Sequence, residues 1–224
     1  KQKTAYEIRP RDWSSDVCSS ALHAGFTKLG ADYRPNSRVL EVRPVNGRFE
    51  VQTERGVIST PKVVLAAGHG SNALEKSLGF DVEIIAERGQ ILVTERVAPM
   101  GILPANGVRQ TAEGTVLIGS TTEDVGYDVS TTPDAGAAMV RRALRVFPAL
   151  ANVRIVRTWA GLRTLTQDEC PVYEQSERYP GAFIATCHSG VTLAAVHANE
   201  LADAIHRGKF TTQIDAFHGR RLHG

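Results

Sequence analysis

The sequence has few of the features that mark several large classes of protein. It contains only 3 cysteines in 224 residues, and Cys18, Cys170 and Cys187 show neither a C-x-x-C spacing nor an even-numbered set. This pattern excludes a disulfide framework and indicates reduced thiols in a cytoplasmic protein. The 26 basic and 24 acidic residues leave a net charge of only +2, which argues against nucleic acid as a partner.

Long apolar runs and targeting signals are lacking as well. No stretch approaches the roughly 20 apolar residues of a membrane-spanning helix, so membrane association is not indicated, and no signal peptide is visible. The histidines do not have metal-ligand spacing, and no G-x-S-x-G serine elbow occurs. With 42% apolar and 22% charged residues, the composition is that of a globular protein with one large domain or two small ones.

The first twenty residues, KQKTAYEIRPRDWSSDVCSS, have neither helical nor strand periodicity. They resemble the translation of a sequencing-library adapter, and the chain does not begin with Met. We therefore expect residues 1–20 to lie outside the fold and the gene to be truncated at its 5′ side.

From Ala21 onward, periodicity predicts mixed helices and strands. Asn46-Gly47 marks a tight hairpin, and Pro133 marks a helix start. We expect helices at 21–29, 72–78, 133–146 and 192–207, and strands at 39–45, 49–53, 57–60, 63–67, 82–94, 115–120, 155–163 and 182–186. Strands grouped between βα-like ends predict an α/β (α+β) fold with an inserted, mostly antiparallel sheet.

Glycine turns follow two apolar runs. VVLAAG ends at Gly68, where a backbone without a side chain can approach a ligand closely, although a plain core strand explains the same run. GAFIATCHSGVT reads as a strand, a turn at Gly190 and a helix start, which offers free N–H groups and partial positive charge. His188 in this turn fits either a structural histidine or a ligand contact.

Two arginines stand beside glycines. Arg163 ends the run GLR, and its planar guanidinium suits a carboxylate. The alternative is a surface salt bridge to Asp168 or Glu169. Arg88-Gly89-Gln90 interrupts a predicted strand, and a β-bulge with a solvated arginine explains it as well as a structural role near a ligand does.

Together these segments resemble the C-terminal part of FAD-dependent oxidoreductases of the D-amino-acid oxidase and glycine oxidase family. GLR-x-x-T-x-D-x-x-P at 161–171 is similar to the family's GLRP-x-T-x-D-G-x-P, with Thr164 in place of proline and Glu169 in place of glycine. The turn CHSGVT is similar to that of the beta-type subunits of opine oxidase, hydrogen cyanide synthase and D-hydroxyproline dehydrogenase.

The resemblance implies roles for individual residues. Arg163 would bind the substrate carboxylate, and His188 would contact flavin or substrate. The residues that would contact FAD are Val39, Ala67, Gly68, Gly161, Ser189, Gly190, Val191 and Thr192. Arg88-Gly89-Gln90 would have a structural role near the flavin.

The resemblance also implies a domain plan and an activity. Residues 21–81 and 160–218 would form a partial, Rossmann-like FAD-binding domain, and 82–159 a substrate-binding sheet. The expected reaction is oxidation of the C–N bond of an amino acid or secondary amine, with flavoprotein or iron–sulfur subunits as possible partners. The family's G-x-G-x-x-G phosphate turn does not occur in this sequence. The alternatives are therefore an inactive fragment or a non-catalytic partner subunit.

Overall fold

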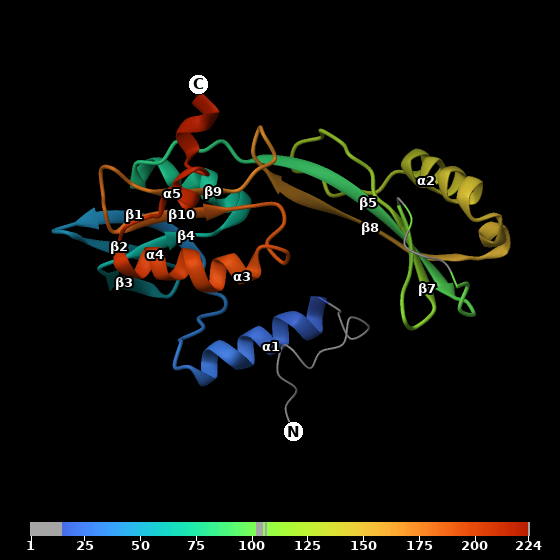
Figure 1. The fold of residues 1–224 in the computed structure, drawn as a ribbon, viewed down its shortest axis with the longest axis horizontal. Coiled ribbons are helices and arrows are strands. Elements are labelled where there is room, and N and C mark those ends of the chain that lie inside the picture. Colours follow the sequence, from blue (N-terminus) through green and yellow to red (C-terminus); the bar gives the residue numbers. More distant parts are fainter. Residues whose placement is uncertain (1–14, 102–104, 106, 224) are drawn as a thin grey trace. The chain divides into compact units, whose positions relative to one another are not determined.

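The computed structural model describes residues 15–101, 105 and 107–223. The chain forms two compact units. The first unit comprises the residues up to Asn36 with Ile91–Ser120 and Thr132–Thr158, and the second comprises Ser37–Gln90, Thr121–Thr131 and Trp159–Gly224. Figure 1 labels most of their helices and strands.

The second unit begins with an antiparallel three-stranded sheet. Strands β1 (Val39–Val45), β2 (Arg48–Thr53) and β3 (Gly56–Thr60) pair in chain order. Asn46 and Gly47 both have positive φ, 49° and 74°, as expected for the turn type that matches the twist of a two-residue hairpin. The hairpin predicted from Asn-Gly and the alternating pattern is therefore confirmed.

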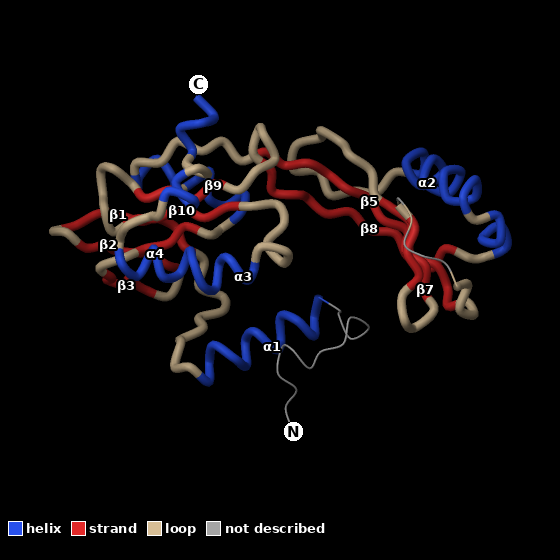
Figure 2. Tube along the Cα trace, in the orientation of Figure 1, coloured by secondary structure: helices blue, strands red, loops and turns tan. Residues whose placement is uncertain are grey.

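A second sheet of this unit contains the buried apolar runs. Strand β4 (Val63–Leu65) pairs in parallel with β10 (Ala182–Thr186), and β9 (Val172–Gln175) pairs antiparallel with the other edge of β10. All three strands lie among the labelled elements of Figure 2. Phe183 and Ile184 of β10 are fully buried, as central strands with continuous apolar sequence should be. Strand β4 ends earlier than residue 67 because the chain turns at Gly68, where φ is +53°.

The helices of the second unit differ from the expected ones in their details. The helix expected at 72–78 is two 3₁₀ helices, η2 (Gly68–Ala73) and η3 (Glu75–Leu78). The helix expected at 192–207 begins at Ala194 and consists of α3 (Ala194–Val196), the π-helical turn η5 (His197–Leu201) and α4 (Ala202–Arg207). The short helices α5 (Thr212–Asp215) and η6 (Gly219–His223) follow.

A four-stranded sheet has the order β6-β7-β5-β8. Its strands are β6 (Val108–Gln110), β7 (Thr115–Gly119), β5 (Ile85–Arg96) and β8 (Ile155–Leu165). Strand β7 is antiparallel to both β6 and β5. Strands β5 and β8 each contribute residues to both units.

In the first unit, the helices α2 (Pro133–Val146) and η4 (Pro148–Asn152) supply apolar residues to a core shared with β5, β6 and β7. Met139 and Ala143 of α2 pack there with Val116 and Ile118 of β7, because residues four apart lie on one face of a helix. Helix α1 (Ser15–Lys28) starts inside the segment 1–20 that we expected outside the fold; residues 1–14 of that segment lie outside the described part of the chain.

The mixed architecture confirms the predicted α/β (α+β) class with antiparallel sheets. The division into units differs from the expected boundaries at 81/82 and 159/160, since it falls after Gln90 and after Thr158 and also groups Thr121–Thr131 with the second unit. Within the described residues, no helix is long and apolar enough to cross a membrane.

Candidate functional site

The guanidinium of Arg163 lies across the backbone of Gly89. Arg163 Nη1 donates a hydrogen bond to Glu87 Oε1 at 2.6 Å, and Nη2 donates to the Thr121 carbonyl oxygen at 2.9 Å. A Cβ atom at Gly89 would lie 2.5 Å from Arg163 Nη2 and 2.8 Å from Cζ. The guanidinium of Arg163 therefore occupies the space that a side chain at residue 89 would fill. The GLR and Arg-Gly-Gln motifs thus lie in direct contact.

Arg88 points into a separate set of polar contacts. Its side chain is only 4% exposed and forms ion pairs with Glu123 at 2.7 Å and Asp128 at 2.5 Å. The hydrogen bond to Glu123 raises the pKa of Arg88. Gln90 Nε2 also donates to Glu123, at 2.8 Å. The alternative of a solvated arginine is therefore wrong: Arg88 is a buried anchor that holds the segment 121–131 on strand β5.

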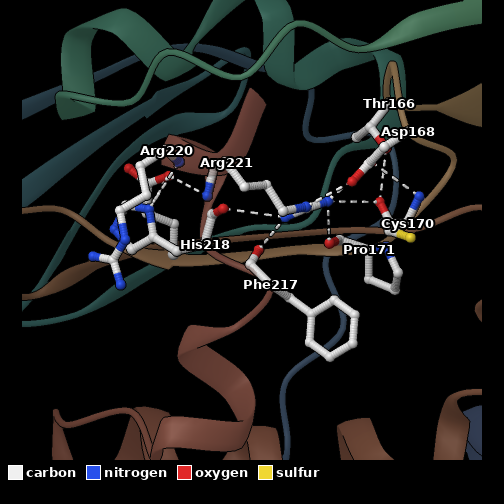
Figure 3. A network of polar contacts seen from close by, with 10 residues as sticks. Thr166, Asp168, Cys170, Pro171, Phe217, His218, Arg220 and Arg221 are labelled. Carbon is white, nitrogen blue, oxygen red and sulfur yellow. Dashed lines mark hydrogen bonds and ion pairs between the residues drawn. The ribbon is translucent and has the colours of Figure 1, made fainter. Parts of the chain in front are cut away.

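Asp168, in the motif at 161–171, does not pair with Arg163; its partner is Arg221. Arg221 Nε donates to Asp168 Oδ2 at 2.7 Å, and Arg221 also donates to the carbonyls of Pro171 and Phe217 (Figure 3). The hydrogen bond from Arg221 lowers the pKa of Asp168 to about 2. The carboxylate that pairs with Arg163 is that of Glu87, in place of the expected alternatives Asp168 and Glu169.

The structure shows the local surroundings of the two departures from the family motif. Glu169 has φ +59°, a left-handed conformation that favours glycine, so the family's glycine suits the backbone at this position. Thr164 lies against the glycine turn, because a Cβ at Gly68 would be 3.4 Å from Thr164 Oγ1. Thr164 thereby adjoins the turn that follows strand β4.

The turn after β4 is attached to Arg163 through a histidine that the sequence motifs did not single out. His69 Nε2 lies 3.1 Å from the Arg163 carbonyl oxygen and 3.4 Å from that of Ile85, so this nitrogen is the donor. Tyr127 packs edge-on against the His69 ring, with centroids 5.6 Å apart. Ala67 and Gly68 are therefore held beside the strand that carries Arg163.

The turn after β10 lies at the surface of the second unit. His188, Ser189, Val191 and Thr192 are exposed, and Ser189 Oγ lies 3.3 Å from His188 Nδ1. In the described part of the chain, the N–H groups of residues 190, 191 and 192 donate no hydrogen bond to a protein acceptor. The bonded helical segments 194–207 follow directly, so these three donors stand at the positive end of a helix dipole.

Three polar side chains, those of Tyr173, Cys187 and His197, lie together next to this turn. Tyr173 Oη and His197 Nε2 are 2.6 Å apart, and Cys187 Sγ lies 3.9 Å from the same nitrogen. Burial raises the pKa of Tyr173 to about 12, raises the pKa of Cys187 and lowers that of His197. All three groups are therefore neutral near pH 7, and they position the turn without adding charge.

The structure separates the remaining expected residues from this arrangement. Val39 starts strand β1 and pairs with Thr53 in the antiparallel sheet. Gly161 lies in β8 two residues before Arg163, and a Cβ there would be 3.4 Å from the Trp159 ring. Gly68 and Arg163 thus lie on linked elements of the second unit, and the exposed turn at 188–192 belongs to the same unit.

Comparison with known proteins confirms the resemblance inferred from the motifs. The family described as FAD dependent oxidoreductase matches residues 15–204. An opine oxidase subunit of Agrobacterium tumefaciens (strain Ach5) is 42% identical over 203 residues, covering 91% of this chain and 55% of the relative. The hydrogen cyanide synthase subunit HcnC of Pseudomonas protegens is 31% identical, covering 91% of this chain and 51% of the relative.

The fold has a counterpart among solved structures. L-proline dehydrogenase from P. horikoshii superimposes with a TM-score of 0.83 at 24% identity, covering 92% of this chain and 59% of that one. The present chain therefore spans about half the length of the curated relatives that it matches.

Proposed function

We propose that this chain, which belongs to the family of FAD-dependent oxidoreductases, is part of an enzyme that oxidises the C–N bond of an amino acid or secondary amine. The chemistry that FAD supplies when bound is acceptance of a hydride from the C–H bond next to the substrate nitrogen, and water then hydrolyses the imine product. The residues of the second unit would bind, orient and stabilise the reacting groups.

The observation that carries this proposal is the set of three backbone donors at residues 190–192. Neighbouring N–H groups at the start of a helical segment suit the electron-rich edge of a flavin ring, and they favour the charge that this edge gains on reduction. These donors need no rearrangement, because no protein acceptor in the described part of the chain competes for them. His188 and Ser189, exposed on the same turn, are proposed contacts of the ring or the substrate.

Other parts of the second unit suit the cofactor and the substrate. The exposed residue Ala67 and the glycine at residue 68 allow close approach of the dinucleotide beside β4. Val39 and Gly161 remain proposed cofactor contacts on the strength of the family resemblance alone. Arg163 would bind the substrate carboxylate through its planar, charged donors.

The relatives also suggest the setting in which the chain works. Two of them are described as subunits of opine oxidase and hydrogen cyanide synthase, which supports an enzyme assembled from several subunits. We propose flavoprotein or iron–sulfur subunits as the partners and the cytoplasm as the location. The same observation favours a second candidate, a non-catalytic partner subunit. Flavin binding at the turn separates the two, because a non-catalytic subunit does not require it.

A charge placed at Val191 tests the proposal. The side chain is 67% exposed, so both Val191→Glu and the neutral control Val191→Gln should leave the fold intact. Charges at helix starts contribute roughly 0.3–1 kcal/mol. Val191→Glu should therefore bind reduced riboflavin about two- to fivefold more weakly than Val191→Gln, with a smaller effect on the oxidised, neutral form. Fluorescence titration measures both, and identical affinities in the two variants would contradict the assignment.

A further inference from the structure

The ion pair between Arg163 and Glu87 has a consequence for what the site can bind. Both side chains are 22% exposed, and the bonded atoms are 2.6 Å apart. A carboxylate thus already occupies the guanidinium on which a substrate carboxylate is proposed to bind. An incoming carboxylate meets a nearly neutral pair and competes with Glu87 for the guanidinium.

Glu87 accepts fewer hydrogen bonds in the described part of the chain than the carboxylate of Glu123 does. Glu123 accepts hydrogen bonds from Arg88, Gln90 and Thr121. Glu87 receives its hydrogen bond in the described part of the chain from Arg163, and it remains partly open to solvent. Four lone-pair sites on a carboxylate leave Glu87 with capacity for a further donor.

We propose that Glu87 binds the positively charged nitrogen of the substrate and thereby selects zwitterionic amino acids over simple carboxylates. Glu87 is then a specificity-determining residue, and the pair opens to receive both charges of one ligand. The inference rests on the proposed function, because it takes Arg163 as the residue that binds the carboxylate.

Glu87 would favour amino acids because of the charges that remain when its ion pair with Arg163 opens. A simple carboxylate that displaces Glu87 from Arg163 leaves a partly buried anion without its partner, which is costly. An amino acid brings an ammonium group with its carboxylate, so one ion pair is exchanged for two. Discrimination of this kind comes from the penalty imposed on the wrong ligand as much as from contacts with the right one.

Glycine and acetate are matched probes, since they share a carboxylate and differ in the ammonium group. We would titrate the chain with each and follow the Arg163 Nε–H and Gly89 amide signals by NMR. The variants are Glu87→Gln, which keeps shape and hydrogen bonding to Arg163, and the control Glu95→Gln. Glu95 forms an ion pair with the more exposed Arg154 in the first unit, with contacts at 2.7 and 3.0 Å.

The expected result is a change of opposite sign for the two ligands. Glu87→Gln should tighten acetate binding and weaken glycine binding by about tenfold each, the scale of one charged hydrogen bond, while Glu95→Gln changes neither. If both ligands shift the Arg163 signal but Glu87→Gln changes them equally or in the same direction, the role of Glu87 is refuted and that of Arg163 stands. If neither ligand moves the Arg163 signal in any variant, the proposed function of Arg163 and the inference both fail.

Discussion

Replacing Gly89 with alanine should displace the guanidinium of Arg163 while leaving the free energy of unfolding almost unchanged. The added Cβ would lie 2.5 Å from Arg163 Nη2, whereas unbonded heavy atoms prefer separations of about 3.5 Å. The guanidinium must therefore move by about 1 Å, which stretches its bonds to Glu87 and Thr121 beyond hydrogen-bond range.

The effect on stability can be worked out from the same contacts. A charged hydrogen bond contributes about 1.5–3 kcal/mol when buried and less at an exposed pair, so we assign about 1 kcal/mol to this partly exposed pair. Alanine in place of glycine inside a strand regains about 0.5–1 kcal/mol. The free energy of unfolding of Gly89→Ala should therefore stay within about 0.5 kcal/mol of the unmodified chain, whereas glycine binding should fall by about tenfold.

Urea unfolding and NMR titration with glycine measure the two quantities. Gly136→Ala is the control, because its Cβ would meet Leu92 at an ordinary 3.7 Å in helix α2; it should raise stability by up to about 1 kcal/mol and leave binding unchanged. In an Arg163→Leu background, Gly89→Ala should have no further effect on binding. Unchanged glycine affinity in Gly89→Ala, or a stability loss above about 2 kcal/mol, would show that residue 89 does not control the position of the Arg163 guanidinium in this way.

Two further predictions concern charged groups away from the site. Arg221→Gln should lower the free energy of unfolding by about 1 kcal/mol at pH 7, and Arg220→Gln, at a more exposed pair, should change it less. The pKa of Asp168 is lowered from 3.8 to about 2. The stabilisation that the Asp168 carboxylate contributes is therefore present above pH 3.8 and is lost as pH falls towards 2. Urea unfolding between pH 4 and 2 should show this loss in the unmodified chain and little of it in Arg221→Gln. Burial raises the pKa of Glu75, so its contribution is full below pH 4.5 and is lost as pH rises through the raised pKa. Glu75→Gln should remove that loss and be at least as stable at pH 8, and a lower stability there would contradict the assignment.

Local patterns in the sequence were sufficient for much of the fold. Strand alternation with Asn46-Gly47 predicted the first hairpin, and Pro133 with apolar residues at helical spacing predicted α2. Strands β6 and β9 were missed because three or four residues show no usable period, and their pairing depends on β7 and β10. The late start of the helix after Gly190 depends on turn geometry that apolar spacing does not encode.

The site was predictable only in part, for a related reason. Arg163 and the turn at Gly190 stood out because each lies in a continuous motif. Glu87 and Arg163 are 76 positions apart, and no periodicity links them. The backbone at residue 89 does not adopt the left-handed conformation, so local geometry does not require glycine there. Glycine is needed because the guanidinium of Arg163 lies against this residue, and only the structure shows that contact.

We propose that the second unit binds the flavin at the turn 190–192 and beside Gly68. The most direct measurement is a titration of the ¹⁵N-labelled chain with FAD, followed through its assigned amide signals. We expect the largest shifts at residues 67–68 and 188–192, while the α2 signals of the first unit remain unchanged. Shifts centred on α2 and η4, or no shifts at 188–192 when FAD binds, would contradict it.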